Sequence, residues 1–207
     1  MSFFDLGVNP AIVKTLSKSG INDPFPIQKA TLPDAISGKD VLGRGQTGSG
    51  KTLAFGLAVL TKLANRKAKP HHPLAIILSP TRELAMQVSE ELNSFYLLKN
   101  RIIAVYGGQP IEKQIMQLKK GVDIVVGTPG RIIDHIERKT IDLSQITHLV
   151  LDEADEIILL PIYPARELPM VGVSSDMIMQ RMKNKNVKVI AKESYNRCDT
   201  TKYNAKF

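Results

Sequence analysis

Cysteine, tryptophan and long apolar runs are scarce or absent in this sequence. Its 207 residues include a single cysteine, Cys198, and no tryptophan. One cysteine cannot form an intramolecular disulfide or a cysteine-based zinc site, which favours a reducing, cytoplasmic setting without zinc. No stretch approaches the roughly 18 apolar residues of a membrane span, and residues 1–5 lack the features of a secretory signal. We therefore expect a soluble protein with no membrane partner.

Acidic residues are outnumbered, with 20 Asp and Glu against 28 Lys and Arg, so the net charge is +8. Residues 161–207 hold nine basic and four acidic side chains, which gives this short segment +5 of the total. A basic surplus fits a polyanionic partner such as nucleic acid, and it also fits a soluble protein that happens to be basic.

Short apolar runs alternate with longer helical patterns over residues 1–160. Strands are expected at 41–43, 74–79, 102–106, 123–127 and 147–151. Helices are expected near 10–19, 26–37, 51–64, 82–97, 110–119 and 129–138, with Thr81 and Thr128 as N-caps. The strands are rich in Val, Ile and Leu without alternation, which is typical of strands buried on both faces. The pattern predicts an α/β domain with a mostly parallel central sheet and helices on both faces.

The pattern weakens after Asp155. We expect residues 1–160 to form the core of the domain and residues 161–207 to be an atypical, basic, partly disordered end of it. Within that end only 170–173 and 187–191 still read as strands.

The clearest motif is Gly45-x4-Gly50-Lys51-Thr52, which follows a short strand and opens a helix. Lys51 would reach the β- and γ-phosphates of a nucleotide, and the Thr52 hydroxyl would ligate Mg²⁺. The middle positions, whose backbone N–H groups would point at phosphate oxygens, are Gln46, Thr47, Gly48 and Ser49. The motif therefore predicts a nucleoside triphosphate site.

Two further observations bear on this site. The rival dinucleotide pattern Gly43-x-Gly45-x-x-Gly48 needs a later acidic residue, and none stands between Asp40 and Glu83. At the end of the last buried strand, Asp152 can hold Mg²⁺ through water, and Glu153 can polarise an attacking water. The alternative is that these two acidic residues lie in a solvated turn and have no catalytic role.

With Ala154 and Asp155, the acidic pair completes Asp152-Glu153-Ala154-Asp155, and the sequence here resembles the DEAD-box RNA helicase family. The likeness extends over residues 3–155. Its other matches are Phe3 ahead of Gly20-x3-Pro24-x-Pro26-Ile27-Gln28, then Pro80-Thr81-Arg82-Glu83-Leu84, Gly107-Gly108 and Thr128-Pro129-Gly130-Arg131. The resemblance implies a RecA-like domain that binds ATP and Mg²⁺ and contacts single-stranded or duplex RNA.

The resemblance also implies roles for single residues. Gln28 would recognise adenine, because its amide offers a donor and an acceptor to the N6 and N7 edge. Phe3 would stack on the base, with Phe4 as a possible substitute; alternatively these rings only pin the N-terminus to the core. Asp155 would couple the domain to a second RecA-like domain. The RNA contacts would be Pro80, Thr81, Arg82, Gly107, Gly108, Thr128, Pro129, Gly130 and Arg131.

The sequence departs from the family after its acidic motif. The nearest counterpart of the family's Ser-Ala-Thr is Ser174-Ser175-Asp176, and nothing after it resembles the second RecA-like domain with its arginine finger. We expect an ATP-binding N-terminal half with slow Mg²⁺-dependent hydrolysis, which would need a second domain to unwind RNA. A non-catalytic ATP- or RNA-binding module, a dominant-negative partner of an intact helicase, and a small-molecule kinase remain the alternatives.

Overall fold

The structure is a computed structural model that describes residues 1–46, 48–64, 66–95, 101–152 and 188–193. Its α-helices are α1 (Pro10–Lys18), α2 (Pro26–Ser37), α3 (Lys51–Leu63), α4 (Arg82–Asn93), α5 (Ile111–Lys119) and α6 (Pro129–Glu137). Its strands are β1 (Val41–Arg44), β2 (Ala75–Leu78), β3 (Ile102–Val105), β4 (Ile124–Gly127), β5 (His148–Leu151) and β6 (Lys188–Glu193). A short 3-10 helix, η2 (Leu143–Gln145), precedes β5.

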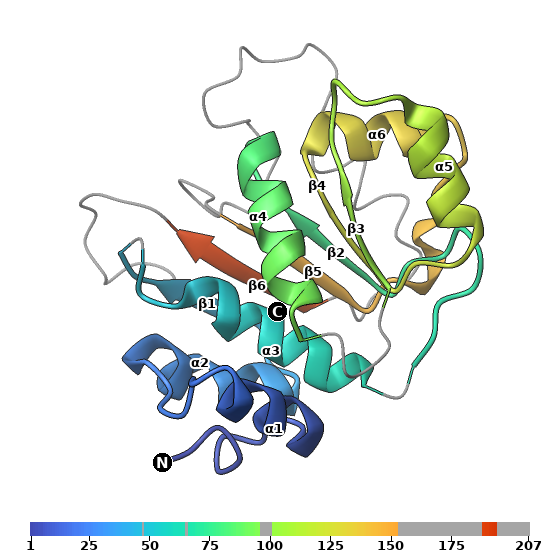
Figure 1. The fold of residues 1–207 in the computed structure, drawn as a ribbon. Helices are drawn as coiled ribbons and strands as arrows, with labels where there is room; N and C mark the ends of the chain where they lie inside the picture. The colour runs from blue at the N-terminus through green and yellow to red at the C-terminus, as the bar shows by residue number, and fades with distance from the viewer. Residues whose placement is uncertain (47, 65, 96–100, 153–187, 194–207) are drawn as a thin grey trace.

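The strands form one six-stranded sheet in the order β1-β6-β5-β2-β4-β3, and every neighbouring pair is parallel. Because the strands are parallel, all their carboxyl ends meet at one edge of the sheet (Figure 1). The segments that follow β1, β2, β3, β4 and β5 therefore share this carboxyl edge. Ligands of open α/β sheets bind at this edge.

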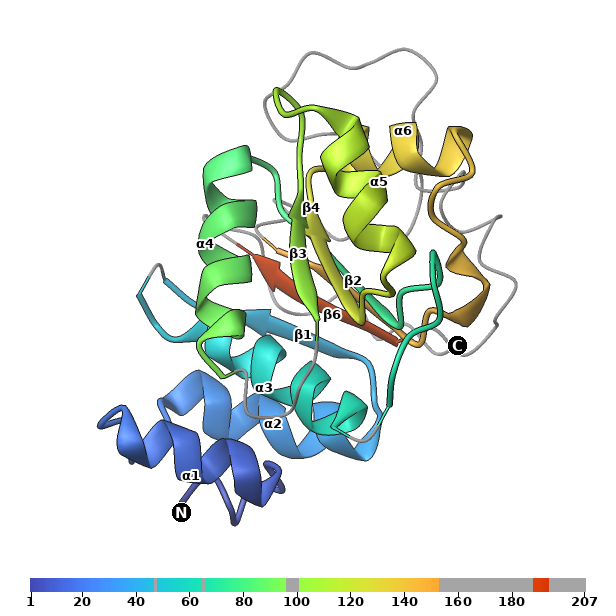
Figure 2. The ribbon, with the colours of Figure 1, turned by 45° about the vertical axis from the view of Figure 1, so that its right-hand side comes forward.

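Two separate apolar cores lie on the two faces of the sheet. Successive residues of β2 alternate between them: Ala75 and Ile77 pack in one core, Ile76 and Leu78 in the other. The first core contains buried residues of α1, α2, α3 and α4, and the second those of α5 and α6. Figure 2 shows α1, α2 and α3 at one end of the molecule and α5 and α6 at the other. The predicted arrangement, a parallel sheet covered by helices on both faces, is confirmed.

Local sequence explains where most helices begin and end. Asn9, which precedes Pro10 at the start of α1, accepts a hydrogen bond from the Ala11 N–H. Thr81, which precedes α4, accepts one from the Leu84 N–H at 3.2 Å. Gly38 ends α2 in the left-handed conformation, with φ of 101°. Thr128 occupies the N-cap position of α6, but its side chain makes no capping hydrogen bond. The prediction that the Thr128 side chain caps this helix was therefore wrong.

Several expectations fall on residues that lie outside the described part of the chain. These are the positions Thr47, Glu153 and Asp155, the strand at 170–173, and Ser174-Ser175-Asp176. The strand expected at 187–191 is described as β6, from Lys188 to Glu193. Among the described helices, none is both long enough and apolar enough to cross a membrane.

Candidate nucleotide and RNA sites

The phosphate loop joins β1 to α3 at the carboxyl edge of the sheet. Gly48 and Gly50 have φ of 80° and 83°, a conformation that glycine adopts without strain. Gly50 is the N-cap of α3, so Lys51 stands in its first turn and Thr52 follows, half-buried. Lys51 is only 5% exposed, and its Nζ donates a hydrogen bond to the Gly45 carbonyl. The loop thus curls around its own lysine.

Side chains are sterically excluded at two positions of this loop. A Cβ on Gly45 would lie 2.7 Å from Ser49 Oγ, and one on Gly50 would lie 2.5 Å from Gln28 Nε2. Ser49 Oγ is buried and has no hydrogen-bond partner among the described residues. A close backbone curl with a spare buried hydroxyl fits a triphosphate, because phosphate oxygens accept hydrogen bonds from such groups.

Gln28 ties the start of α2 to the phosphate loop. Its Oε1 accepts a hydrogen bond from the Phe25 N–H at 2.8 Å, and its Nε2 donates one to the Gly50 carbonyl at 3.0 Å. The residue is 1% exposed. An amide has two donor hydrogens and an acceptor oxygen with two lone pairs, so one of each remains for a further partner. The predicted adenine reader therefore stands beside the predicted phosphate site.

Phe25 is a candidate site residue that the sequence analysis missed. It is 52% exposed, and a Cβ on Gly50 would lie 2.5 Å from its ring. The flanking Pro24 and Pro26 were the available sequence signal, since prolines favour an extended chain that presents the intervening side chain. An aromatic face thus borders both Gln28 and the phosphate loop.

The aromatic residues named by sequence lie elsewhere. Phe3 is 1% exposed and packs in the core with α1–α4, whereas Phe4 is 62% exposed. The position of Phe3 favours the alternative in which this ring pins the N-terminus to the core. Its stacking on a base stays a prediction.

Asp152 follows β5 at the carboxyl edge and is 3% exposed. Its N–H donates to the Leu78 carbonyl at 2.8 Å, which continues the pairing of β5 with β2 beyond the last strand residue. The carboxylate is therefore held in line with the end of β2, on the same edge as Lys51 and Thr52.

The segments that follow β2 and β3 meet through Arg82 and a glycine turn. A Cβ on Gly108 would lie 2.6 Å from Arg82 Nη1, and one on Gly107 would lie 3.6 Å from Arg82 Nη2. Gly108 also has φ of 83°. The guanidinium of Arg82 therefore lies against the glycine doublet, and a side chain at Gly108 would force it to shift. Thr81, Arg82 and Gly108 are all exposed.

Arg131 has a different environment from Arg82. Its side chain is only 13% exposed, and both its Nη1 and its Nη2 donate to the Gln109 carbonyl at 3.2 Å. Its Nη1 also lies 3.4 Å from Gln114 Oε1. The sequence analysis expected Arg131 to contact RNA; the structure gives its guanidinium partners inside the protein, which brace the turn after Gly108.

A buried histidine completes this network between α5 and α6. Gln114 Nε2 donates to the Tyr106 carbonyl at 3.1 Å, so Gln114 Oε1 is the atom that faces His135 Nε2, at 2.9 Å. Because that oxygen can only accept, His135 Nε2 must carry the proton. His135 Nδ1 lies 2.7 Å from Thr140 Oγ1. Burial, and then the nearby Arg131 charge, lower the pKa of His135 from 6.5 to about 4, so the ring is neutral near pH 7.

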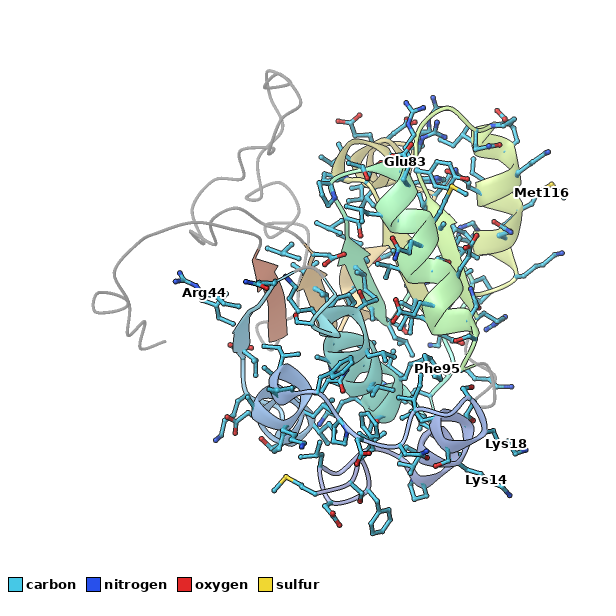
Figure 3. All side chains as sticks on the ribbon, turned by 60° about the vertical axis from the view of Figure 1, so that its left-hand side comes forward. Lys14, Lys18, Arg44, Glu83, Phe95 and Met116 are labelled. Carbon is cyan, nitrogen blue, oxygen red and sulfur yellow. The ribbon has the colours of Figure 1, made fainter. Side chains whose placement is uncertain are left out.

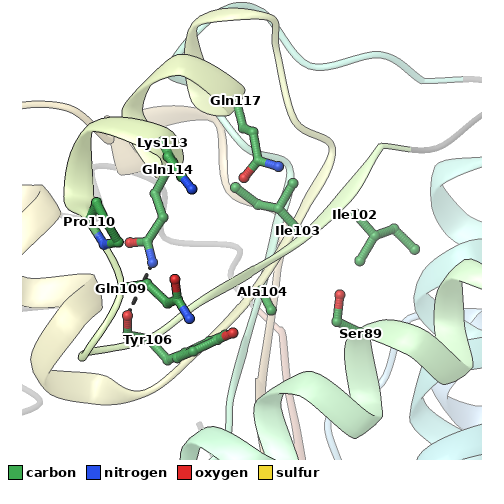
Figure 4. Close-up of a pocket in the computed structure, with 10 residues that line it drawn as sticks. All are labelled: Ser89, Ile102, Ile103, Ala104, Tyr106, Gln109, Pro110, Lys113, Gln114 and Gln117. Atoms are coloured by element: carbon green, nitrogen blue, oxygen red, sulfur yellow. Dashed lines mark hydrogen bonds between the residues drawn. The ribbon is translucent and has the colours of Figure 1, made fainter.

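An open groove of about 380 Å³ lies beside this turn, between α4, β3 and α5 (Figure 4). Its lining is mixed, with apolar residues of β3 on its floor and polar side chains of α5 on one side. The lining residues are Ser89, Ile102, Ile103, Ala104, Tyr106, Gln109, Pro110, Lys113, Gln114 and Gln117. The groove adjoins the predicted RNA contacts at Gly107 and Gly108.

Comparisons with known proteins agree with this geometry. The family model described as DEAD/DEAH box helicase matches residues 25–160. ATP-dependent RNA helicase CshA of Listeria monocytogenes is 49% identical over 157 residues, which cover 75% of this chain and 30% of the relative. DEAD-box ATP-dependent RNA helicase 9 of Oryza sativa subsp. japonica is 45% identical over 197 residues, 88% of this chain and 31% of the relative. The chain thus spans under a third of these relatives.

Solved structures are similar as well. A DEAD box protein from Methanococcus jannaschii superposes with a TM-score of 0.75 at 33% identity, over 95% of this chain and 51% of that one. The RNA-helicase Prp28 from Chaetomium thermophilum, bound to ADP, gives 0.74 at 30% identity, over 92% and 44%. The sheet and the phosphate loop define a RecA-like domain. The chain belongs to the DEAD/DEAH box helicase family, and the matched region is the N-terminal domain.

Proposed function

We propose that this chain binds ATP with Mg²⁺ at the phosphate loop and acts as the ATP-binding half of a DEAD-box RNA helicase. The observation that carries the proposal is the pairing of Gly50, left-handed at the N-cap of α3, with the buried Lys51 that follows it. The helix N-terminus and the lysine present positive charge to the same point. In the complex, Lys51 would exchange the Gly45 carbonyl for a phosphate oxygen.

Selectivity for adenine is assigned to Gln28 and Phe25. Gln28 borders the loop and keeps one donor and one acceptor for the base edge. The exposed ring of Phe25 offers a stacking face next to it. Guanine presents two acceptors where adenine presents a donor and an acceptor, so a single amide in this position favours ATP over GTP.

Hydrolysis would use residues at two strand ends. Thr52 and Asp152 would hold Mg²⁺, which supplies neutralisation of phosphate charge when it is bound. Glu153 would orient the attacking water and accept its proton. Without an arginine finger from a second RecA-like domain, which is worth ~10³–10⁵ in rate, turnover should be slow. Asp155 would communicate with that second domain.

RNA contact is proposed for the carboxyl ends of β2, β3 and β4, as sequence predicted. The exposed Thr81 and Arg82 stand at the N-terminus of α4, above the glycine doublet. Such a surface suits phosphate oxygens and reads no base sequence. The other assigned positions are Pro80, Gly107, Gly108, Thr128, Pro129, Gly130 and Arg131. Both curated relatives are named RNA helicases, which supports this partner.

Phosphate release separates an ATPase from a non-catalytic binding module. We expect slow release that requires Mg²⁺ and rises when single-stranded RNA is added, because RNA orders the carboxyl edge. Lys51→Ala should abolish it, while Lys62→Ala, an exposed lysine of the same helix, should not. Release at background level by a chain that still binds ATP would instead support the binding module.

A further inference from the structure

Six basic side chains gather at the edge of the sheet opposite the nucleotide site. They lie in the segments that precede β2, β3 and β4, at the amino ends of these parallel strands. We call this surface the basic amino edge; its members are Arg66, Lys67, Lys69, Arg101, Lys119 and Lys120. All are exposed except Arg101, which is half-buried. Figure 3 shows Lys14 and Lys18 of α1 at the same end of the molecule as Phe95, which precedes β3.

A buried carboxylate fixes these segments to one another. Asp123, 0% exposed, accepts hydrogen bonds from the Ala68 N–H at 2.6 Å and the Arg101 N–H at 2.8 Å. The Arg101 guanidinium in turn donates to the carbonyls of Lys120 and Ala68. These hydrogen bonds hold the backbones of three separate segments in one arrangement, which places their basic residues at the same end of the sheet.

Basic residues outnumber acidic ones on this surface, although the Arg101 guanidinium pairs with Asp123 at 3.9 Å. Within residues 64–74 and 118–123, the only acidic residue is Asp123, whose carboxylate is buried and directed at backbone N–H groups. Asp142 lies nearby and is 3.4 Å from His72 Nε2. Of the exposed large apolar residues of the described chain, Met116 lies on the same helix as Lys119, and Met1, Phe4, Phe25, Leu42 and Met86 belong to other segments.

We propose that the basic amino edge binds the phosphate backbone of RNA, as a second contact apart from the carboxyl edge. The inference rests on the proposed RNA partner. Protein interfaces concentrate binding energy in apolar and aromatic anchors, of which the described residues beside this surface offer Met116, whereas lysines bind phosphates through charge alone. The contact reads no sequence and holds RNA on the domain independently of the nucleotide state.

The test compares two charge-reversed double variants of the whole chain. The first carries Lys67→Glu and Lys120→Glu; the control carries Lys29→Glu and Lys39→Glu, two exposed lysines of α2 and the segment after it. Binding of a fluorescent uridine homopolymer is titrated over a range of salt concentrations. Each phosphate contact contributes about 0.7 to the slope of log K against log salt. We expect the first variant to lower the slope by about 1.4 and to bind about tenfold more weakly than the control.

Two further measurements keep this proposal distinct from the proposed function. If Arg82→Gln leaves RNA affinity unchanged while the first variant loses it, the carboxyl-edge assignment fails and the amino edge stands. If the first variant matches its control in slope and affinity, the proposed RNA contact at the basic amino edge is overturned. The proposal is also overturned if the wild-type chain binds no RNA. If the first variant loses binding to poly-glutamate but keeps its binding to RNA, the proposed RNA contact is also overturned. Such a result would favour an acidic protein as the partner of this surface. Unchanged ATP affinity confirms that the variants are folded.

Discussion

At the scale of single residues, Phe25 and Phe4 compete for the role of stacking on the adenine base. Both rings are exposed, but only Phe25 lies against Gly50 and Gln28. Aromatic stacking on a base is worth about 1–3 kcal/mol. We predict that Phe25→Ala weakens ATP binding at least about fivefold and that Phe4→Ala leaves it unchanged. Fluorescent-nucleotide titration measures both; a loss confined to Phe4→Ala would assign the stack to the N-terminus.

The glycine doublet offers a matched pair of substitutions. Gly108 and Gly20 both have positive φ, of 83° and 78°, so alanine at either site should cost about 1 kcal/mol of folding free energy. A Cβ at Gly108 would meet Arg82, whereas one at Gly20 meets nothing within 4 Å. We predict that Gly108→Ala weakens RNA binding and that Gly20→Ala does not. Urea denaturation should show that both variants lose a similar amount of unfolding free energy. Equal RNA affinities would show that Arg82 over the doublet does not set the contact.

Residue positions were predictable where a motif has one physical interpretation. The position of Lys51 follows from the loop spacing, and the Thr81 cap from its place before an amphipathic helix. Phe25 and the partners of Arg131 were not predictable, because they depend on which distant segments fold beside them. Gln28 was named from sequence, but its hydrogen bond to Gly50 was not predictable, because it joins residues that are 22 positions apart.

At the scale of elements, the buried network between α5 and α6 makes stability depend on pH. The pKa of His135 is about 4 in the folded chain and 6.5 ordinarily. As pH falls below 6.5 the unfolded chain takes up a proton that the folded chain does not, so stability is full above 6.5 and is lost toward pH 4. The loss should approach about 3 kcal/mol.

Urea denaturation between pH 7 and pH 4.5 tests this dependence. His135→Gln should remove the His135 contribution, because an amide can still donate to Gln114 without titrating. Parallel curves for wild type and His135→Gln would mean that the buried ring contributes nothing to the pH dependence.

Element positions were largely predictable, and their arrangement was not. The expected strands and helices match those observed to within a few residues, because buried parallel strands and amphipathic helices carry strong local patterns. The sheet order, with β6 between β1 and β5, depends on long-range pairing that no local pattern encodes. The joining of Ala68, Arg101 and Lys120 through Asp123 likewise depends on segments that are distant in the sequence.

At the scale of the whole molecule, the parallel sheet separates two proposed binding surfaces, the carboxyl edge and the basic amino edge. The phosphate loop, Asp152 and Arg82 lie at the carboxyl edge. The basic residues whose segments are joined through Asp123 lie at the basic amino edge. The chain spans 30% and 31% of the lengths of the two curated relatives named above. What this domain should supply by itself is adenosine-selective nucleotide binding.

Titration of the wild-type chain with ATP and with GTP, in the presence of Mg²⁺, tests that claim most directly. We predict that ATP binds at least about fivefold more tightly, since a mismatched amide edge costs roughly 1–3 kcal/mol. Lys51→Ala should bind neither nucleotide. Equal affinities for the two nucleotides, or ATP binding that survives Lys51→Ala, would contradict the account.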